Sequence, residues 1–314
     1  MRGSIRNHLK KALPSYIILV VIIVVVSLIS PTFRKPANIR NIIAQCAVLA
    51  VVAIAQTNVL LIGGIDMSVS SVISFGTISV AMFSDTGAGG MVFSLVLALA
   101  VGAVTGLVNG IGVVRFKIPA MIITISTQAL LKGICLVLMP KSGGKVNAAF
   151  AAFLKTRFGV INVSAIIALI LYVLFFFLYH YTKFGRSMYA VGNSELYAAQ
   201  SGVPVKKTII LTYVVSGLVS AVAGIILAAR ISTGNPLVGD PYAMNSVASA
   251  VVGGVSMTGG VGTVLGALSG AVIMSLINNV INNMDISPYY QYITRGFVLV
   301  VSLLIFQLKG RKKA

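Results

Sequence analysis

Residues 42–61 read IIAQCAVLAVVAIAQTNVLL, a stretch of twenty residues without a single charged side chain. An α-helix needs about 20 mostly apolar residues to cross the hydrocarbon core of a bilayer. Only helices and closed barrels pair every backbone polar group inside that core, and this continuous stretch lacks the alternation of a barrel strand. The stretch therefore predicts a transmembrane helix and, with it, a helical membrane fold.

The rest of the chain repeats this pattern. Of the 314 residues, 58% are hydrophobic and 9% are charged, whereas a soluble domain has about 25% charged residues. Further apolar stretches lie near 15–30, 68–84, 90–114, 118–138, 161–181, 209–229, 242–257, 263–284 and 289–308. We expect an all-α fold, a polytopic transmembrane bundle of about ten spans in one domain over 1–314. The stretch 242–257 is short and rich in small residues, which also fits a re-entrant segment.

Basic residues dominate the charge. The chain has 24 Lys and Arg against 5 Asp and Glu, a net charge of +19. Most of these cations lie in short gaps between apolar stretches, which is typical of membrane topology and anionic lipid contact and not of nucleic-acid binding. With ten spans, the termini and even-numbered loops hold 14 of them and the odd-numbered loops hold 8. The positive-inside rule then predicts that both termini are cytoplasmic.

Two loops are longer than a tight turn. Residues 139–160 are expected outside the cell and residues 182–208 in the cytoplasm. Long loops at a membrane face often carry binding functions.

A short internal repeat indicates duplicated halves. Asn109 and Asn278 each lie ten positions before a proline, and the two copies are five spans apart. An odd offset makes the copies inverted in the membrane, as in many transporters. A match of this length also arises by chance.

The sequence does not favour an enzyme. His8 and His180 stand apart from carboxylates, so neither a metal site nor an acid–base pair is expected. The glycine-rich residues 141–145 lack the spacing of a phosphate-binding loop. We therefore expect the chain to bind no metal or cofactor and to hydrolyse no ATP by itself.

Polar side chains inside spans are costly in lipid and tend to face a bundle interior or an aqueous path. The candidates for a translocation path are Gln56, Asn58, Asp66, Asn109, Thr124, Thr127, Gln128, Asn245, Asn278 and the neighbouring Asn279. Hydrogen bonding between packed helices is the alternative for each of them. None of the mid-span candidates is a carboxylate, because Asp66 falls between two apolar stretches, where a helix N-cap is its simplest role.

Three further features have structural interpretations. Lys132 and Arg295 fall inside apolar stretches, and we expect both to extend toward lipid headgroups, with lining of the path or contact with anionic groups as the alternative. Gly262, Gly266 and Gly270 recur every four residues, which predicts close helix packing.

Several motifs carry a family resemblance. In chain order they are GGIDMSV (63–69), IPA (118–120), FGR (184–186), YAVG (189–192), ELYAAQSG (195–202), GGVSMTGGVGT (253–263) and YYQ (289–291). Together they resemble the ribose/xylose-type permease subunits of bacterial ABC sugar importers, in the branched-chain amino acid/ribose permease superfamily. Lys132 stands where an arginine is usual and Met67 where a leucine is usual, so the substrate could differ from ribose.

The resemblance implies a permease that moves a ribose-like monosaccharide across the bacterial inner membrane. It implies a homodimer on two cytoplasmic ABC ATPase subunits, which use ATP and Mg²⁺, and an extracytoplasmic solute-binding protein. It also implies that the cytoplasmic loop 182–208 couples to the ATPase, through Asn193, Glu195, Leu196, Tyr197, Ala198, Ala199, Gly202 and Val203. The small side chains would let a short helix seat in a groove of the ATPase, and Glu195 near its start would favour the helix dipole. An ordinary surface helix is the alternative.

Two other readings of the function stay open. The first is an ion-gradient-driven secondary transporter of a small polar solute, which would need no ATPase. The lack of a mid-span carboxylate counts against it. The second is an ABC permease for another solute, such as a nucleoside, a branched-chain amino acid or a signalling furanose.

Overall fold

The computed structural model describes residues 16–17, 19–28, 30–283, 290, 293 and 296–297. An apolar helix covers Leu19–Leu28. The elements that follow are α2 (Pro36–Leu61), α3 (Val69–Phe83), α4 (Ala88–Arg115), α5 (Ala120–Leu138), α6 (Ala148–Lys155), β1 (Arg157–Phe158), β2 (Ile161–Asn162), α7 (Val163–Tyr181), α8 (Lys183–Asn193), α9 (Glu195–Gln200), α10 (Val205–Ile231), α11 (Asp240–Val252) and α12 (Val264–Asn283). The predicted helical class is confirmed. The predicted span 289–308, with Arg295, lies outside the described residues apart from four isolated positions.

Six of the described helices are long and apolar enough to cross a membrane: α2, α4, α5, α7, α10 and α12. The apolar helices Leu19–Leu28 and α3 are shorter. Helix α11 has 13 residues, so at about 1.5 Å per residue it spans about 20 Å, less than the roughly 30 Å hydrocarbon core. The predicted span 242–257 is therefore a short helix followed by a turn.

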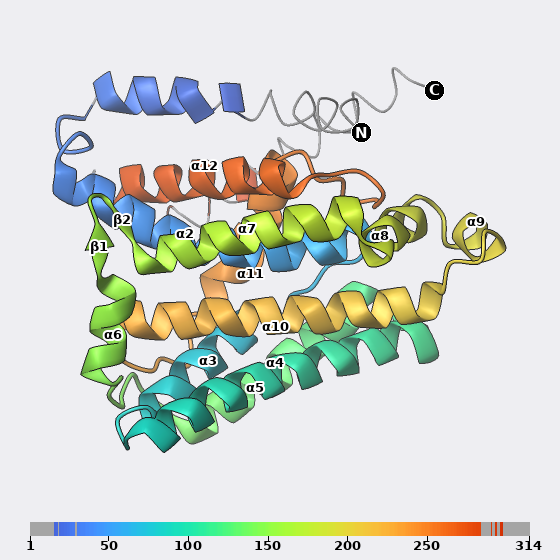
Figure 1. Ribbon diagram of the computed structural model, residues 1–314, viewed down its shortest axis with the longest axis horizontal. Coiled ribbons are helices and arrows are strands. Elements are labelled where there is room, and N and C mark those ends of the chain that lie inside the picture. The colour runs from blue at the N-terminus through green and yellow to red at the C-terminus, as the bar shows by residue number, and fades with distance from the viewer. Residues whose placement is uncertain are drawn as a thin grey trace.

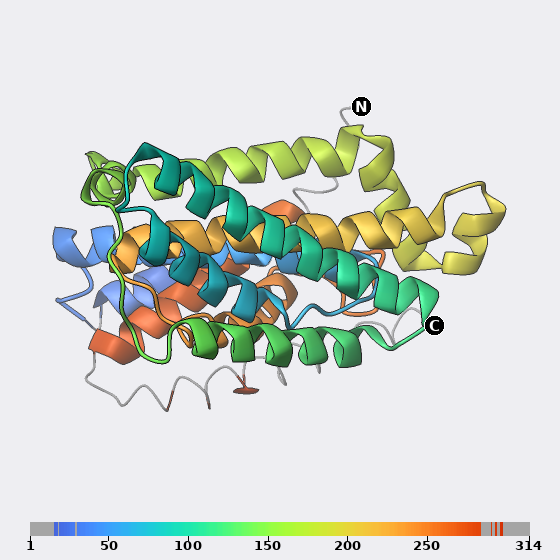
Figure 2. The same cartoon turned by 90° about the horizontal axis from the view of Figure 1, so that it is seen from below.

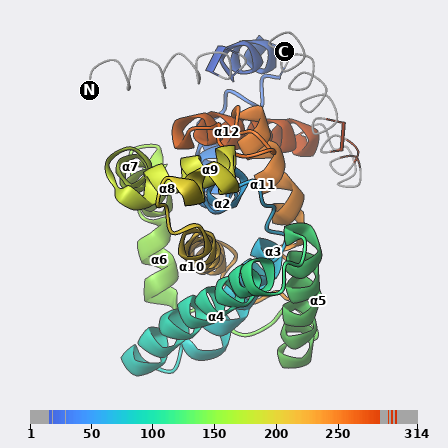
Figure 3. The same cartoon turned by 90° about the vertical axis from the view of Figure 1, so that its right-hand side faces the viewer.

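The long helices run along the longest axis of the molecule (Figure 1). Helix α10 lies at the centre of the bundle (Figure 3) and packs against α2, α3 and α4. Helices α5 and α7 lie on opposite sides (Figure 2). Helix α6 and the β1–β2 hairpin lie at one end of the bundle and α9 at the other, and we call these the α6 end and the α9 end.

Glycines bring the central helices together. A Cβ atom on Gly102 of α4 or on Gly217 of α10 would collide with the backbone of the other helix. The same holds for Gly266 and Gly270 of α12 against the end of α11. The packing role predicted for these two residues of the glycine stripe is confirmed, because only residues without side chains allow such close approach.

The two long loops contain structure that apolar patterning did not reveal. In the first, Asn147 caps α6 by accepting a hydrogen bond from the Phe150 amide at 3.1 Å. Strands β1 and β2 then pair antiparallel, Arg157 with Asn162 and Phe158 with Ile161. The second loop, predicted over 182–208, forms α8 and α9.

Candidate solute pathway and coupling region

The loop of residues 62–68, between α2 and α3, lies inside the bundle. A Cβ atom on Gly64 would collide with the phenol of Tyr213, eight residues after the start of α10 at Val205. Gly63 has φ +79°, a backbone conformation that favours glycine. The turn therefore requires this pair of glycines, and it places Asp66 among the helices.

Asp66 is 1% exposed and each of its carboxylate oxygens has a partner. Oδ1 accepts hydrogen bonds from the Ser68 amide at 3.0 Å and the Ser68 hydroxyl at 2.6 Å. Oδ2 accepts one from the Ser216 hydroxyl of α10 at 2.9 Å. The predicted N-cap role of Asp66 is wrong, since the N-cap residue of α3 is Ser68. The carboxylate instead fixes the turn before α3 and ties that turn to α10.

Other path candidates extend these contacts. The Asn109 amide donates to the Ser68 hydroxyl at 2.9 Å and accepts from the Thr127 hydroxyl at 2.7 Å. The Thr124 hydroxyl donates to the Ile65 carbonyl at 3.0 Å. Helices α4 and α5 are thus hydrogen-bonded to the same loop.

Helix α2 contributes through Gln56. Oriented with its nitrogen toward the Asp66 carbonyl, the Gln56 amide donates there at 2.9 Å and accepts from the Asp66 amide at 3.3 Å. We call this set the Asp66 network: Gln56, Asp66, Ser68, Asn109, Thr124, Thr127 and Ser216. It joins α2, α4, α5 and α10 around the 62–68 loop. For these residues the structure therefore shows interhelical hydrogen bonding, which was the alternative to a role in the translocation path.

Three more candidates lie elsewhere. Gln128 of α5 donates to the Ser70 hydroxyl of α3 at 2.8 Å. Asn58 is fully buried and accepts from the Tyr179 hydroxyl of α7 at 2.6 Å. Asn279 exchanges hydrogen bonds with Asn38, at 3.1 and 2.9 Å. All three hold helices together.

The remaining candidates, Asn245 and Asn278, line a cavity of about 420 Å³ among α2, α10, α11 and α12. We call it the amide cavity, and its polar lining is Gln45, Arg230, Tyr242, Asn245, Ser275, Asn278 and Asn282. Asn245 is 5% exposed, and its side-chain oxygen has no hydrogen-bond partner among the described residues. Sequence reasoning missed Gln45, although an amide inside the stretch 42–61 was a usable signal.

Helix α9 projects beyond the other helices at the α9 end (Figure 1). Ser194 caps it by accepting from the Tyr197 amide at 3.4 Å. Leu196 and Tyr197 are 65% and 70% exposed, whereas Ala198 is 4% exposed and belongs to a cluster that includes Tyr213. The Ala198 side chain is thus buried against its own bundle, and its contact with a partner stays a prediction. The exposed residues of α9 are Glu195, Leu196, Tyr197, Ala199 and Gln200, and Leu196 and Tyr197 are the large apolar side chains among them.

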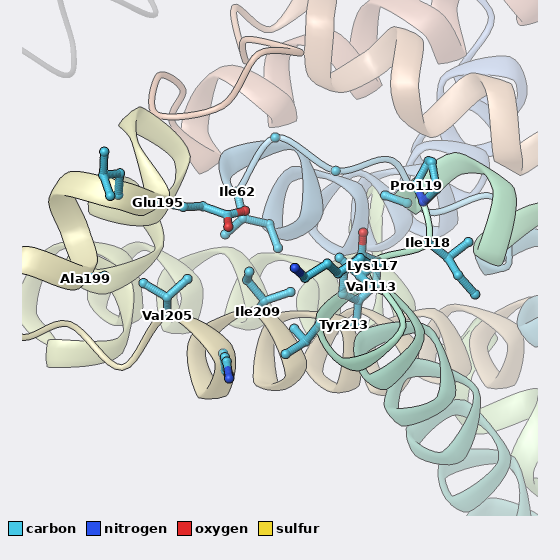
Figure 4. Close-up of a pocket in the computed structure, with 16 residues that line it drawn as sticks. Ile62, Val113, Lys117, Ile118, Pro119, Glu195, Ala199, Val205, Ile209 and Tyr213 are labelled. Atoms are coloured by element: carbon cyan, nitrogen blue, oxygen red, sulfur yellow. The ribbon is translucent and has the colours of Figure 1, made fainter.

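A cavity of about 730 Å³ lies behind α9, bounded by α10 and the turn between α4 and α5. Figure 4 shows Glu195 of α9 and Lys117 of that turn pointing into it from different sides. Lys117 has φ +54°, the left-handed conformation that non-glycine residues rarely adopt. Ala199 also lines the cavity, so α9 has open space on its inner side.

Helix α8 connects α9 to the interior. A Cβ atom on Gly192 would collide with the Leu61 carbonyl, which accepts a hydrogen bond from the Gly260 amide at 2.9 Å. The Tyr189 hydroxyl donates to the Gly262 carbonyl at 2.8 Å, and burial raises the pKa of this phenol, so it stays a donor. Helix α8 therefore touches the turn after α11 and the last residue of α2, immediately before the 62–68 loop.

The rest of the coupling set surrounds α9. The Asn193 amide donates to the Tyr189 carbonyl at 2.7 Å within α8. Gly202 ends the α9 turn with φ +78°, and Val203 packs against the same cluster as Ala198.

Six cations lie in or between the helices that meet at the α9 end: Arg115, Lys117, Lys183, Arg186, Lys206 and Lys207. The eight terminal cations predicted on the same side lie outside the described residues. Lys132 is different, because its ammonium group pairs with the Asp240 carboxylate of α11 at 2.6 Å. The expected extension of Lys132 toward a headgroup is wrong.

Long apolar helices around buried polar contacts, with loops that turn into the bundle, define a multi-pass membrane protein. The family described as branched-chain amino acid transport system, permease component, matches residues 38–303. The chain belongs to this permease family.

Its relatives include sugar permeases. The chain is 37% identical to the ribose import permease protein RbsC of Haemophilus influenzae over 95% of this chain and 94% of that one. It is 33% identical to the protein of the same name from Bacillus subtilis, over 93% and 91%. The galactose/methyl galactoside import permease protein MglC of Haemophilus influenzae is 29% identical, over 95% and 94%. No solved structure matches the chain.

Proposed function

We propose that this chain is the transmembrane subunit of an ATP-binding-cassette importer that moves a ribose-like monosaccharide across the bacterial inner membrane. The observation that carries the proposal is the exposed α9, joined through α8 to the turn after α11 and to the last residue of α2. A motor that moves α9 would shift that turn and the end of α2, from which the 62–68 loop leads into α3. Rigid movement of packed helices by a ligand-driven partner is a common route for opening a site to alternate sides.

The amide cavity supports a neutral polyhydroxylated solute. Amides and hydroxyls both donate and accept hydrogen bonds, which suits sugar hydroxyl groups. Among the described carboxylates none lines this cavity. The names of the relatives in ribose, galactose and arabinose import point to the same class of solute.

The proposed assembly is a homodimer of this chain with about ten spans each, two ATPase subunits on the cytoplasmic α9 end and a solute-binding protein at the α6 end. ATP and Mg²⁺ would be used by the ATPase alone, and both termini would be cytoplasmic. An inverted repeat is part of the proposal. It is supported by α4 and α12, which carry Asn109 and Asn278 and run in opposite directions along the bundle (Figure 1).

The test is reconstitution in liposomes with the cognate ATPase and solute-binding protein. We expect uptake of radiolabelled D-ribose that requires hydrolysable ATP, with D-galactose, L-arabinose, adenosine and leucine as competitors to define the solute. Uptake that proceeds without the ATPase and follows an imposed ion gradient would establish a secondary transporter instead.

Variants of α9 test the coupling role. Tyr197→Ala, which removes an exposed ring, and Gly202→Leu should lower ATP-dependent uptake while the chain still inserts in the membrane. Gly87→Leu, before α4, is the matched control for Gly202→Leu, since Gly87 also has a positive φ of +99° and a side chain there also meets nothing within 4 Å. Normal uptake by both variants, or labelling of Tyr197 from outside the cell, would remove α9 from the coupling role.

A further inference from the structure

A second cavity, at the α6 end, is lined by four cations from four different elements. It has a volume of about 440 Å³, and the cations are Arg40 of α2, Lys155 of α6, Arg157 of β1 and Arg230 of α10. Asn41, Asn162 and Ser164 complete its polar lining. We call it the basic cavity.

No described carboxylate lines the basic cavity. Asp66 is held in its network, Glu195 lies at the opposite end, and Asp85 and Asp240 pair with Lys145 and Lys132. The fifth acidic residue, Asp285, lies outside the described residues.

Four like charges around one space repel each other unless an anion lies among them. The described contact of the Lys155 ammonium group is with a neutral hydroxyl, that of Ser232 at 2.7 Å. Arginine forks match the oxygens of a phosphate in pairs, and such charge-assisted hydrogen bonds are about twice as strong as neutral ones. The chemistry of the lining therefore fits a phosphate group.

Exposed apolar side chains lie on the same two elements that carry Lys155 and Arg157, α6 and the β1–β2 hairpin. Phe153 of α6 is 60% exposed, and Phe158, Val160 and Ile161 of the hairpin are 66%, 47% and 45% exposed. In the sequence they flank Lys155 and Arg157. Exposed apolar groups interleaved with cations at the end of a transmembrane bundle are typical of residues at the boundary between headgroups and acyl chains.

The adjoining helix extends this surface toward the interior of a bilayer. Helix α7 follows the hairpin directly, and its Leu169, Ile170 and Val173 are exposed. A ligand with a phosphate and a long apolar tail would fill the basic cavity and lie along this face, which a free anion would leave uncovered.

We propose that the basic cavity binds the phosphate of an anionic phospholipid, with Arg40, Lys155, Arg157 and Arg230 around the headgroup and the β1–β2 hairpin against the acyl chains. Three of its four cations, Arg40, Lys155 and Arg157, lie outside the amide cavity and away from the α9 end, so the site can be tested separately from the solute and the ATPase. It anchors the α6 end to the headgroup layer while the α9 end moves.

The test counts phosphatidylglycerol and phosphatidylcholine retained by the purified full chain, by native mass spectrometry after delipidation and titration. The variant is Arg40→Gln/Lys155→Gln/Arg157→Gln, which leaves Arg230 intact because it also lines the amide cavity. The matched control is Arg34→Gln/Lys35→Gln/Lys141→Gln, which removes the same charge outside the basic cavity.

We expect wild-type protein and the control to retain phosphatidylglycerol in preference to phosphatidylcholine. At about a fivefold loss per cation removed, the cavity variant should bind phosphatidylglycerol on the order of a hundredfold more weakly. Thermal unfolding in phosphatidylcholine nanodiscs, expected to match wild type, shows that the variant is folded.

Three results would overturn the proposal. Equal losses in both triple variants would mean general attraction to the membrane surface. Inorganic phosphate that displaces the lipid at similar concentration would mean a site for free anions. Unchanged lipid retention together with lost capture of the solute-binding protein would mean that the cavity receives acidic side chains of that partner.

Discussion

The Asp66 network and the amide cavity use the same kinds of side chain for different purposes. In the network, both oxygens of Asp66 are bonded and the residue is 1% exposed. In the cavity of about 420 Å³, Asn245 is a buried lining residue, and its amide oxygen is unpartnered in the described part of the chain. Polar groups in a span hold helices together when neighbours satisfy them, and they are available to a solute when space replaces a neighbour.

The largest expected effect is on folding, from Asp66→Ala. The change leaves the Ser68 amide, the Ser68 hydroxyl and the Ser216 hydroxyl without their acceptor. Each buried unsatisfied group costs about 1–3 kcal/mol, so we expect a loss of more than about 3 kcal/mol. Thermal unfolding and the yield of monodisperse protein measure it.

Asp85→Ala is the control for this change, because it removes an exposed carboxylate paired with Lys145. Such pairs contribute at most about 1 kcal/mol. If Asp66→Ala protein unfolds like wild type yet transports nothing, the carboxylate belongs to the solute path and the contrast between the two regions disappears.

The intermediate effect is on transport, from Asn245→Leu. The amide oxygen has no described partner to lose, so stability should stay within about 0.5 kcal/mol of wild type or rise. Losing one hydrogen bond to the solute, worth about 1 kcal/mol, should reduce ATP-dependent uptake of D-ribose about fivefold. Ser126→Leu, at an exposed polar position on α5 that lines neither the amide cavity nor the basic cavity, should transport normally. A variant that transports as well as wild type would show that the cavity does not contact the solute.

The smallest effect belongs to the Gln128–Ser70 hydrogen bond between α5 and α3. Interhelical hydrogen bonds in membrane proteins average about 0.6 kcal/mol by double-mutant cycle. The cycle of Gln128→Leu with Ser70→Ala, measured by thermal unfolding, should give a coupling of that size with uptake unchanged. Zero coupling accompanied by lost uptake would move Gln128 from helix packing to the solute path.

Apolar patterning predicts the long helices well because a span is a local property. The stretch 90–114 becomes α4 over Ala88–Arg115, and 118–138 becomes α5 over Ala120–Leu138. Apolar patterning fails where the end of a helix depends on glycine conformation and on contacts with residues distant in the sequence. Helix α11 ends at Val252 because Gly254, with φ +87°, turns the chain, and Gly253 packs closely against the backbone of Gly266. Helix α6 was missed because eight residues carry too little pattern to stand out in a loop.

For the site, the sequence identifies the polar residues but not their partners. Asp66 and Ser216 are 150 positions apart, so no local pattern connects them. Sequence reasoning placed Asn109 and Asn245 in one group, and only the fold separates a bonded amide from one beside a cavity. Ala198 shows the same limit, since its small size suits both a partner's groove and its own bundle.

The short helices α3 and α11 determine how the protein can open. Helix α3 starts after an interior turn and α11 ends in one. The turn after α11 is held by contacts such as Gly260 N–H to the Leu61 carbonyl and occupies depth that a full-length helix would have filled. Moving that turn breaks a few isolated hydrogen bonds, whereas shearing a long helix would break a cooperative ladder. Amide hydrogens of the turn after α11 should therefore exchange with deuterium before those of α10, and the barrier to solute passage would be as thin as that turn.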